Sequence, residues 1–142
     1  PMVAGIVLHL LGQIHSLTKQ NNFKPEDITE SIINKARIIF RTNIDRDISI
    51  ESVAEELNVS YAWFRKSFKA YSGIAPHQYL LQLKIEKAKI LLADPSLQIK
   101  EIALLLNFKS PFYFSKLFRE KTGLSPRAVQ KSNAPVKQKD QK

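Results

Sequence analysis

The sequence contains an internal repeat, which constrains the fold more than any other feature. Residues 50–76 align with residues 99–126, with one residue inserted near the middle of the second copy. The identical pairs, in chain order, are Ile50/Ile99, Ala54/Ala103, Leu57/Leu106, Asn58/Asn107, Ser60/Ser110, Phe64/Phe114, Lys66/Lys116, Phe68/Phe118, Gly73/Gly123 and Pro76/Pro126. So many identities in one fixed order indicate that a single structural unit occurs twice.

Each copy of the repeat has the local pattern of a helix-turn-helix. In the first copy, Ala54 lies midway along a first helix, where a small side chain lets a second helix cross closely. Asn58 ends that helix, because asparagine tolerates the left-handed backbone of a tight helix ending. Ser60 can then cap the second helix, and Gly73 can end it. The second copy predicts the same unit.

Outside the repeat, apolar residues recur at helical spacing, and no alternating strand pattern of useful length occurs. We therefore expect an all-α fold of two helix-turn-helix, homeodomain-like subdomains joined by a long linker helix, with an extra N-terminal helix. The expected segments are a helix over 2–20, a helix over 27–42, a first helix-turn-helix over about 49–72, a linker helix over 76–93, a second helix-turn-helix over about 98–122 and a last helix over 125–132. Residues 133–142 are polar and predict a tail.

Helical periodicity separates a core face from an outer face on these helices. The core-facing side chains expected in the repeats are Phe64, Phe68, Tyr71, Phe114 and Phe118. Those expected on the helix over 27–42 are Ile28, Ile32, Ile33, Ala36, Ile39 and Phe40.

The outer face of each second helix is basic and mixed with apolar or aromatic groups. It carries Ala62, Trp63, Arg65, Lys66 and Lys69 in the first unit, and Phe112, Tyr113, Ser115, Lys116 and Arg119 in the second. In the DNA major groove, Lys and Arg donate to guanine and apolar groups meet thymine methyls, so these helices are candidate readers of base sequence. For one helix alone, an ordinary solvated face explains the pattern equally well; the duplication favours the DNA interpretation.

Charge and composition narrow the function classes. A net charge of +9 favours a polyanionic partner, either nucleic acid or an anionic membrane surface. The membrane alternative is disfavoured because the basic residues are split between two equivalent helices. The chain has no cysteine, His9, His15 and His77 lack metal-ligand spacing, and four glycines form no phosphate loop. We therefore expect no enzyme, metal or cofactor; an RNA-binding module or a helix-mediated dimerisation module stays as an alternative.

Residues 45–130 resemble the AraC/XylS family of bacterial transcription regulators. The strings that carry the resemblance are "SIESVAEELNVSYAWFRKSFKAYSGIAPHQYLLQLKIEKAKILL" and "IKEIALLLNFKSPFYFSKLFREKTGLSP". The resemblance implies seven helices and two recognition helices in successive major grooves, ~34 Å apart. The base-reading positions that it implies are Ala62, Trp63, Arg65, Lys66, Phe112, Tyr113, Ser115 and Lys116.

The expected phosphate contacts are Ser60, Lys69, Lys109, Ser110 and Arg119, since Lys69 and Arg119 lie near helix ends. The sequence departs from the family pattern in three places. Lys84 replaces a common arginine in the linker helix, and Val129 and Gln130 replace an aromatic residue and an arginine in the last helix.

The resemblance further implies that residues 25–132 are the DNA-binding part of a longer cytoplasmic protein. The longest apolar stretch, residues 2–17, is too short to span a bilayer comfortably, so we expect no membrane partner. Residues 1–24 would be the helix and linker left from an N-terminal sensing or dimerisation domain. Their apolar stripe consists of Val3, Ile6, Val7, Leu10, Leu11, Ile14 and Leu17. Residues 2–20 or the preceding domain would then form a homodimer, or the stripe would fold back on residues 25–132. Contact with RNA polymerase is a further implication of the family.

Overall fold

A computed structural model of the chain describes residues 24–133. Within that range the chain forms seven helices and no strand, as expected for an all-α fold. The helices are α2 (Pro25–Thr42), α3 (Ile50–Glu56), α4 (Tyr61–Ser72), α5 (Pro76–Leu92), α6 (Ile99–Leu105), α7 (Pro111–Thr122) and α8 (Pro126–Asn133). The two ends of each expected segment from 27–42 onward lie within two residues of the observed helix ends. The helix expected over 2–20 and most of the polar tail lie outside the described residues.

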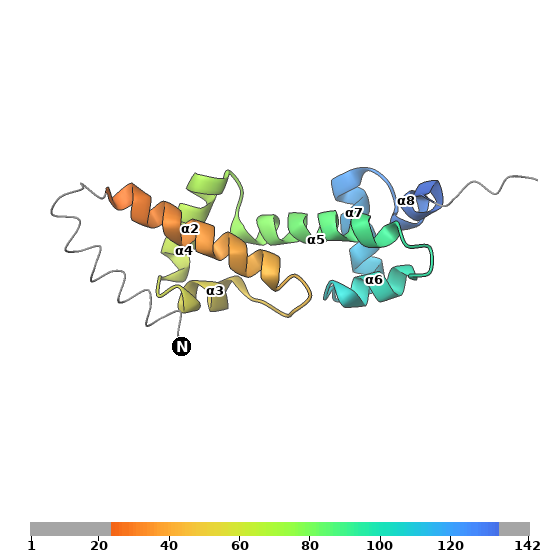
Figure 1. Ribbon diagram of the computed structural model, residues 1–142, viewed down its shortest axis with the longest axis horizontal. Coiled ribbons are helices and arrows are strands. Elements are labelled where there is room, and N and C mark those ends of the chain that lie inside the picture. The colour runs from red at the N-terminus through yellow and green to blue at the C-terminus, as the bar shows by residue number, and fades with distance from the viewer. Residues whose placement is uncertain (1–23, 134–142) are drawn as a thin grey trace, which may run out of the picture.

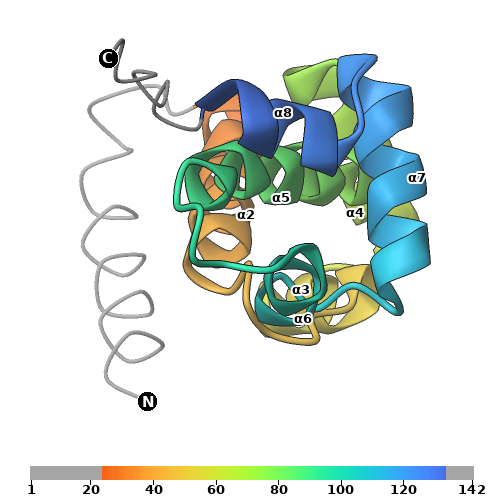
Figure 2. The ribbon, with the colours of Figure 1, turned by 90° about the vertical axis from the view of Figure 1, so that its right-hand side faces the viewer.

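The seven helices form two units strung along α5. Figure 1 shows α2, α3 and α4 at one end of α5 and α6, α7 and α8 at the other. In the view down the long axis, α3 and α6 overlap, as do parts of α4 and α7 (Figure 2). The second helix-turn-helix is therefore displaced along α5 in about the same orientation as the first.

Each unit has its own hydrophobic core, and α5 contributes to both. The first core consists of Ile33, Ala36, Phe40, Ile50, Val53, Ala54, Phe64, Phe68 and Leu80. The second core consists of Ile85, Ala88, Leu92, Ile102, Ala103, Leu106, Phe114 and Phe118. In both, two phenylalanines of the second helix sit in the middle, fully buried, as the periodicity predicts.

The linker helix changes its buried face halfway along its length. Leu80 and the half-buried Leu83 pack into the first core, whereas Ile85, Ala88 and Leu92 pack into the second. At about 100° per residue, these two sets point to different sides of α5. One rigid helix is thereby shared by both units and fixes one against the other.

The periodicity is wrong at two of the predicted core positions. Ile28 is 49% exposed and Tyr71 is 40% exposed. Tyr71 lies at the end of α4, where its hydroxyl donates a 3.3 Å hydrogen bond to the carbonyl oxygen of Glu26. Arg37 adds a 2.9 Å hydrogen bond to the hydroxyl of Ser72. These polar contacts tie α2 across the end of α4, so Tyr71 needs its hydroxyl at the surface.

The last helix is held by the residue that departs from the family pattern. The side-chain amide of Gln130 donates to the carbonyl oxygens of Leu97 at 2.7 Å and of Asp94 at 3.2 Å. Val129 packs against the second core. Gln130 therefore anchors α8 to the loop that follows α5, and Val129 anchors it to the second core.

Both helix-turn-helix turns rest on an asparagine in the left-handed backbone region. The φ angle is 57° at Asn58 and 56° at Asn107, and both are the only non-glycine residues with positive φ in the described part of the chain. In the first unit, the amide of Val59 donates a 3.0 Å hydrogen bond to the carbonyl oxygen of Ala54. In the second unit, the amide of Phe108 donates a 2.9 Å hydrogen bond to the carbonyl oxygen of Ala103. The sequence prediction of these turns is confirmed.

Replacing either asparagine by alanine is expected to destabilise the chain by about 1–2 kcal/mol, because a Cβ without a compensating polar group strains this conformation. Asn58→Gly and Asn107→Gly should stay close to wild type, since glycine adopts positive φ freely. Urea denaturation followed by circular dichroism measures both effects. Gln82→Ala, an exposed change on α5, is the control. Equal stability of the alanine and glycine variants would contradict the strain.

Candidate nucleic-acid interface

The second helix of each unit is defined by the same pair of end contacts. The hydroxyl of Ser60 accepts a 3.2 Å hydrogen bond from the amide of Trp63, and the hydroxyl of Ser110 accepts one of 3.0 Å from the amide of Tyr113. At the other ends, Gly73 and Gly123 have φ angles of 80° and 82°, and each donates a 2.8 Å backbone hydrogen bond to the helix. α4 and α7 therefore have the same length and begin and end at equivalent positions of the repeat.

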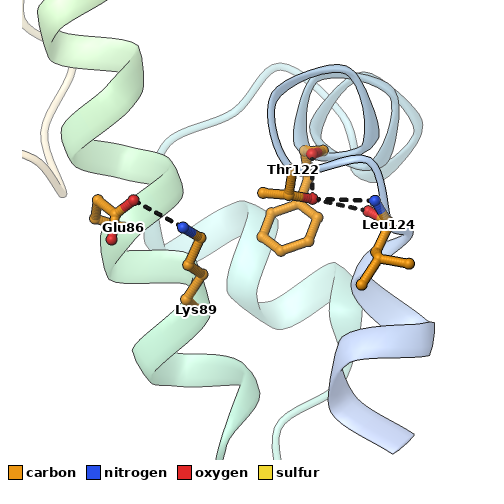
Figure 3. Close-up of polar contacts among 5 residues, drawn as sticks. Glu86, Lys89, Thr122 and Leu124 are labelled. Carbon is orange, nitrogen blue, oxygen red and sulfur yellow. Dashed lines mark hydrogen bonds and ion pairs between the residues drawn. The ribbon is translucent and has the colours of Figure 1, made fainter. Parts of the chain in front are cut away.

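Local side-chain contacts fix where α7 ends. The hydroxyl of Thr122 donates a 2.7 Å hydrogen bond to the carbonyl oxygen of Phe118. The same hydroxyl accepts a 3.3 Å hydrogen bond from the amide of Leu124 (Figure 3). Figure 3 also shows the 2.8 Å ion pair between Glu86 and Lys89 on the exposed side of α5. The threonine ties the last turn of α7 to the glycine turn that leads into α8.

The outer faces of α4 and α7 lie on one side of the molecule, away from α2 (Figure 2). Seven of the eight candidate base-reading residues are exposed: Ala62, Trp63, Arg65, Lys66, Phe112, Tyr113 and Lys116. Ser115 is half-buried. Seven of the eight candidates are therefore open to solvent on α4 and α7, and Ser115 is the exception.

The candidate phosphate contacts lie on or just before the same two helices. Lys69, Arg119, Lys109 and Ser60 are exposed, and Ser110 is half-buried. The hydroxyl oxygens of Ser60 and Ser110 each accept a hydrogen bond from a backbone amide of the helix that they cap. The hydroxyl hydrogen of each serine therefore stays available to donate to a phosphate. The helix N-termini that they cap also favour negative charge.

Two aromatic contacts support the outward side chains. The guanidinium of Arg65 lies 5.8 Å from the ring centre of Tyr61, and the rings of Phe108 and Tyr113 lie 6.5 Å apart. Sequence reasoning missed Tyr61, which is 40% exposed. Its spacing of four residues from Arg65 on one helix is the signal that could have found it.

Ser115 opens onto a groove between α7 and α8, where sequence reasoning missed Arg127. Gln98, Ser125 and Gln130 also line this groove. Arg127 is exposed at the start of α8 and lines the groove together with Ser115 of α7. No periodicity in one helix could have found it, because its position depends on how α8 packs.

Lys84 joins the two units at the middle of α5. Its ammonium lies 5.4 Å from the ring centre of Phe108, in the turn before α7. Burial lowers the pKa of Lys84 below its ordinary value, and the nearby carboxylate of Asp47 opposes that shift. The lysine therefore lies between the loop before α3 and the turn of the second unit.

Two structural observations bear on other classes of function. Among residues 24–133, no three histidine, aspartate or glutamate side chains gather where they could hold a metal ion. Within the same range, no helix combines the length and apolarity needed to cross a bilayer.

Two equivalent units with exposed, basic second helices, joined by one shared helix, define a double helix-turn-helix domain. The family model described as "Helix-turn-helix domain" matches residues 53–132, more than half of the chain. The chain belongs to the AraC family of helix-turn-helix transcription regulators.

Comparison with individual proteins agrees with this assignment. The HTH-type transcriptional activator RhaR of Salmonella schwarzengrund is 27% identical over 121 residues, which are 82% of this chain and 43% of RhaR. The C-terminal domain of AraT, a response regulator from Geobacillus stearothermophilus, is 31% identical with a TM-score of 0.70, over 78% of this chain and 93% of that domain.

An AraC-type regulator structure from Chromobacterium violaceum is 28% identical with a TM-score of 0.69, over 75% of this chain and 96% of that one. The relatives are named as regulators, in agreement with the expectation that the chain is not an enzyme. The chain spans less than half the length of the curated relatives that it matches.

Proposed function

We propose that this chain is the DNA-binding part of a bacterial transcription regulator and that it binds double-stranded DNA sequence-specifically, with α4 and α7 in adjacent major grooves. One observation carries the proposal. Two equivalent, exposed, basic helices lie on the same side of one rigid helix. Helices presented in this way can enter neighbouring grooves on one face of a duplex, about one helical turn apart.

The side chains divide into two roles within this proposal. Lys66 and Lys116, at identical places in the repeat, donate to guanine acceptors, and Arg65 adds a planar donor in the first unit. The phosphate contacts flank them and set the register of each helix without reading bases. α5 holds the two readers at a fixed separation because both cores share it.

For the whole protein, the proposal is a cytoplasmic regulator that contacts RNA polymerase and pairs through residues 2–20 or through a further domain. Support comes from family membership and from the greater length of the curated relatives. Sedimentation equilibrium of the 142-residue chain, with and without residues 1–24, tests the first route to pairing. A monomer in both cases contradicts pairing through residues 2–20.

Selection from a pool of random duplexes tests sequence-specific binding. The bound fraction is sequenced, and fluorescence anisotropy measures the affinity of the enriched duplex. The proposal expects two conserved blocks about ten base pairs apart. Enrichment of a single block would mean that only one unit reads bases and that the other contacts only the DNA phosphates. If no motif emerges and structured RNA binds more tightly than duplex DNA, the RNA-binding alternative replaces the proposal.

Loss of one recognition lysine is expected to weaken specific binding. Lys66→Ala and Lys116→Ala should each cost about 1–3 kcal/mol on the selected duplex and relax the base preference in one block. Anisotropy titrations against selected and random duplexes measure the difference. Lys35→Ala, an exposed change on α2, is the control and should retain specificity. Equal losses on selected and random DNA would make these lysines phosphate contacts.

A further inference from the structure

One apolar side chain on the recognition surface contributes to neither core. Phe112 is 80% exposed, the most exposed large hydrophobic residue in the described part of the chain. It is the second residue of α7, directly after Pro111 and the capping Ser110. First-turn residues of a recognition helix are those that reach base edges in helix-turn-helix proteins.

The neighbouring aromatic residues of α7 pack against other side chains of the protein. Phe114 and Phe118 are fully buried, with ring centres 5.8 Å apart. Tyr113 leans on Phe108, as described above. Phe112 instead shares the outer face with Lys116, four residues along the helix. The helix cap fixes the start of α7, so this ring is presented to solvent from a defined backbone position.

The repeat supplies an internal control for the structural need of this ring. Ala62 occupies the equivalent position in the first unit and is also exposed. The first unit has the same cap, turn and core arrangement with a methyl group at that place. A phenyl ring is therefore not required to build the helix-turn-helix, and its presence is particular to the second unit.

The chemistry of a phenyl ring limits what it can recognise in the major groove. It has no hydrogen-bond donor or acceptor, so it cannot distinguish the O4 acceptor of thymine from the N4 donor of cytosine. The apolar group on a pyrimidine edge is the 5-methyl of thymine. We propose that Phe112 reads a pyrimidine 5-methyl group in the block bound by α7, so that thymine and 5-methylcytosine are accepted there and uracil and cytosine are disfavoured.

This inference rests on the proposed function, because it places α7 in a major groove. Its test uses the full chain and the duplex enriched from the random pool. Each thymine of the α7 block is replaced in turn by deoxyuridine, which keeps every hydrogen-bonding group and removes only the methyl. At one position the affinity should fall about fourfold, the factor that corresponds to burial of one methyl group, ~0.8 kcal/mol. Cytosine there should bind more weakly than 5-methylcytosine.

Two variants separate the methyl contact from general effects on binding. Phe112→Ala should bind the thymine and deoxyuridine duplexes equally, with an unchanged thermal midpoint because the ring is exposed. Leu104→Ala removes an equally exposed side chain, 79% accessible, from α6 and should keep the wild-type preference for thymine.

The outcomes distinguish failure of this inference from failure of the proposed function. If the pool yields an enriched duplex whose α7 block contains no thymine, or tolerates every deoxyuridine within twofold, only the methyl contact is overturned. Retention of the thymine preference by Phe112→Ala has the same consequence. If no duplex is enriched, the proposed function falls and the methyl contact falls with it.

Discussion

Phe64→Ala and Phe118→Ala are each expected to destabilise their own unit by about 3–5 kcal/mol, the usual cost of emptying a phenylalanine site in a packed core. Both side chains are fully buried, and each packs on a second phenylalanine of the same helix, with ring centres 5.7 Å apart in the first unit and 5.8 Å in the second. Because the two cores share no member, each cavity weakens one unit directly.

The only tryptophan of the chain makes the two effects separable. Trp63 lies on α4, so its fluorescence reports on the first unit, while circular dichroism reports on all helices. For Phe64→Ala the tryptophan transition in urea should move to lower denaturant. For Phe118→Ala the helical signal should be lost before the tryptophan signal. Phe112→Ala, with an exposed ring, is the control, and native-like unfolding of both core variants would refute the core assignment.

Salt should weaken DNA binding about 10³-fold or more between 50 and 200 mM. If about six phosphates are neutralised, the logarithm of the affinity falls with the logarithm of salt at a slope near −5, because each contact releases a condensed counterion. The net charge of +9 and the exposed cations of the two units, among them Lys69, Lys109 and Arg119, are sufficient to neutralise about six phosphates. Anisotropy titrations on the selected duplex at several salt concentrations measure the slope.

Individual cations identify which groups contribute to that slope. Lys69→Ala and Arg119→Ala should each reduce it by about 1, with little change in base preference. Lys35→Ala, an exposed change on α2, should leave it unchanged. A flat response to salt in the wild-type chain would exclude phosphate contacts as the main source of affinity.

The helices were predictable because their ends are encoded locally. Ser60 and Ser110 cap through the next turn of their own helices, and Asn58 and Asn107 set the turns through their own backbone angles. Such signals need no knowledge of distant neighbours. The repeat then confirmed each of them with an independent copy.

The errors and omissions arise where the outcome depends on another helix. Periodicity placed Tyr71 toward the core, but the partner of its hydroxyl comes from the start of α2, at Glu26. Arg127 and the half-buried position of Ser115 depend on how α8 packs beside α7. A helical wheel gives the direction of a side chain along one helix, but it does not reveal what covers that side chain.

Because α5 belongs to both cores, it fixes the distance and the relative rotation between α4 and α7. Because α5 is buried on different sides at its two ends, its residue count sets both the separation and the angular offset of α4 and α7. One residue added near its middle would turn one reader relative to the other by about 100° and advance it by about 1.5 Å. Under the proposed function, substitutions on the exposed faces of α4 and α7 would therefore change the bases that are read without changing the interval between the two helices.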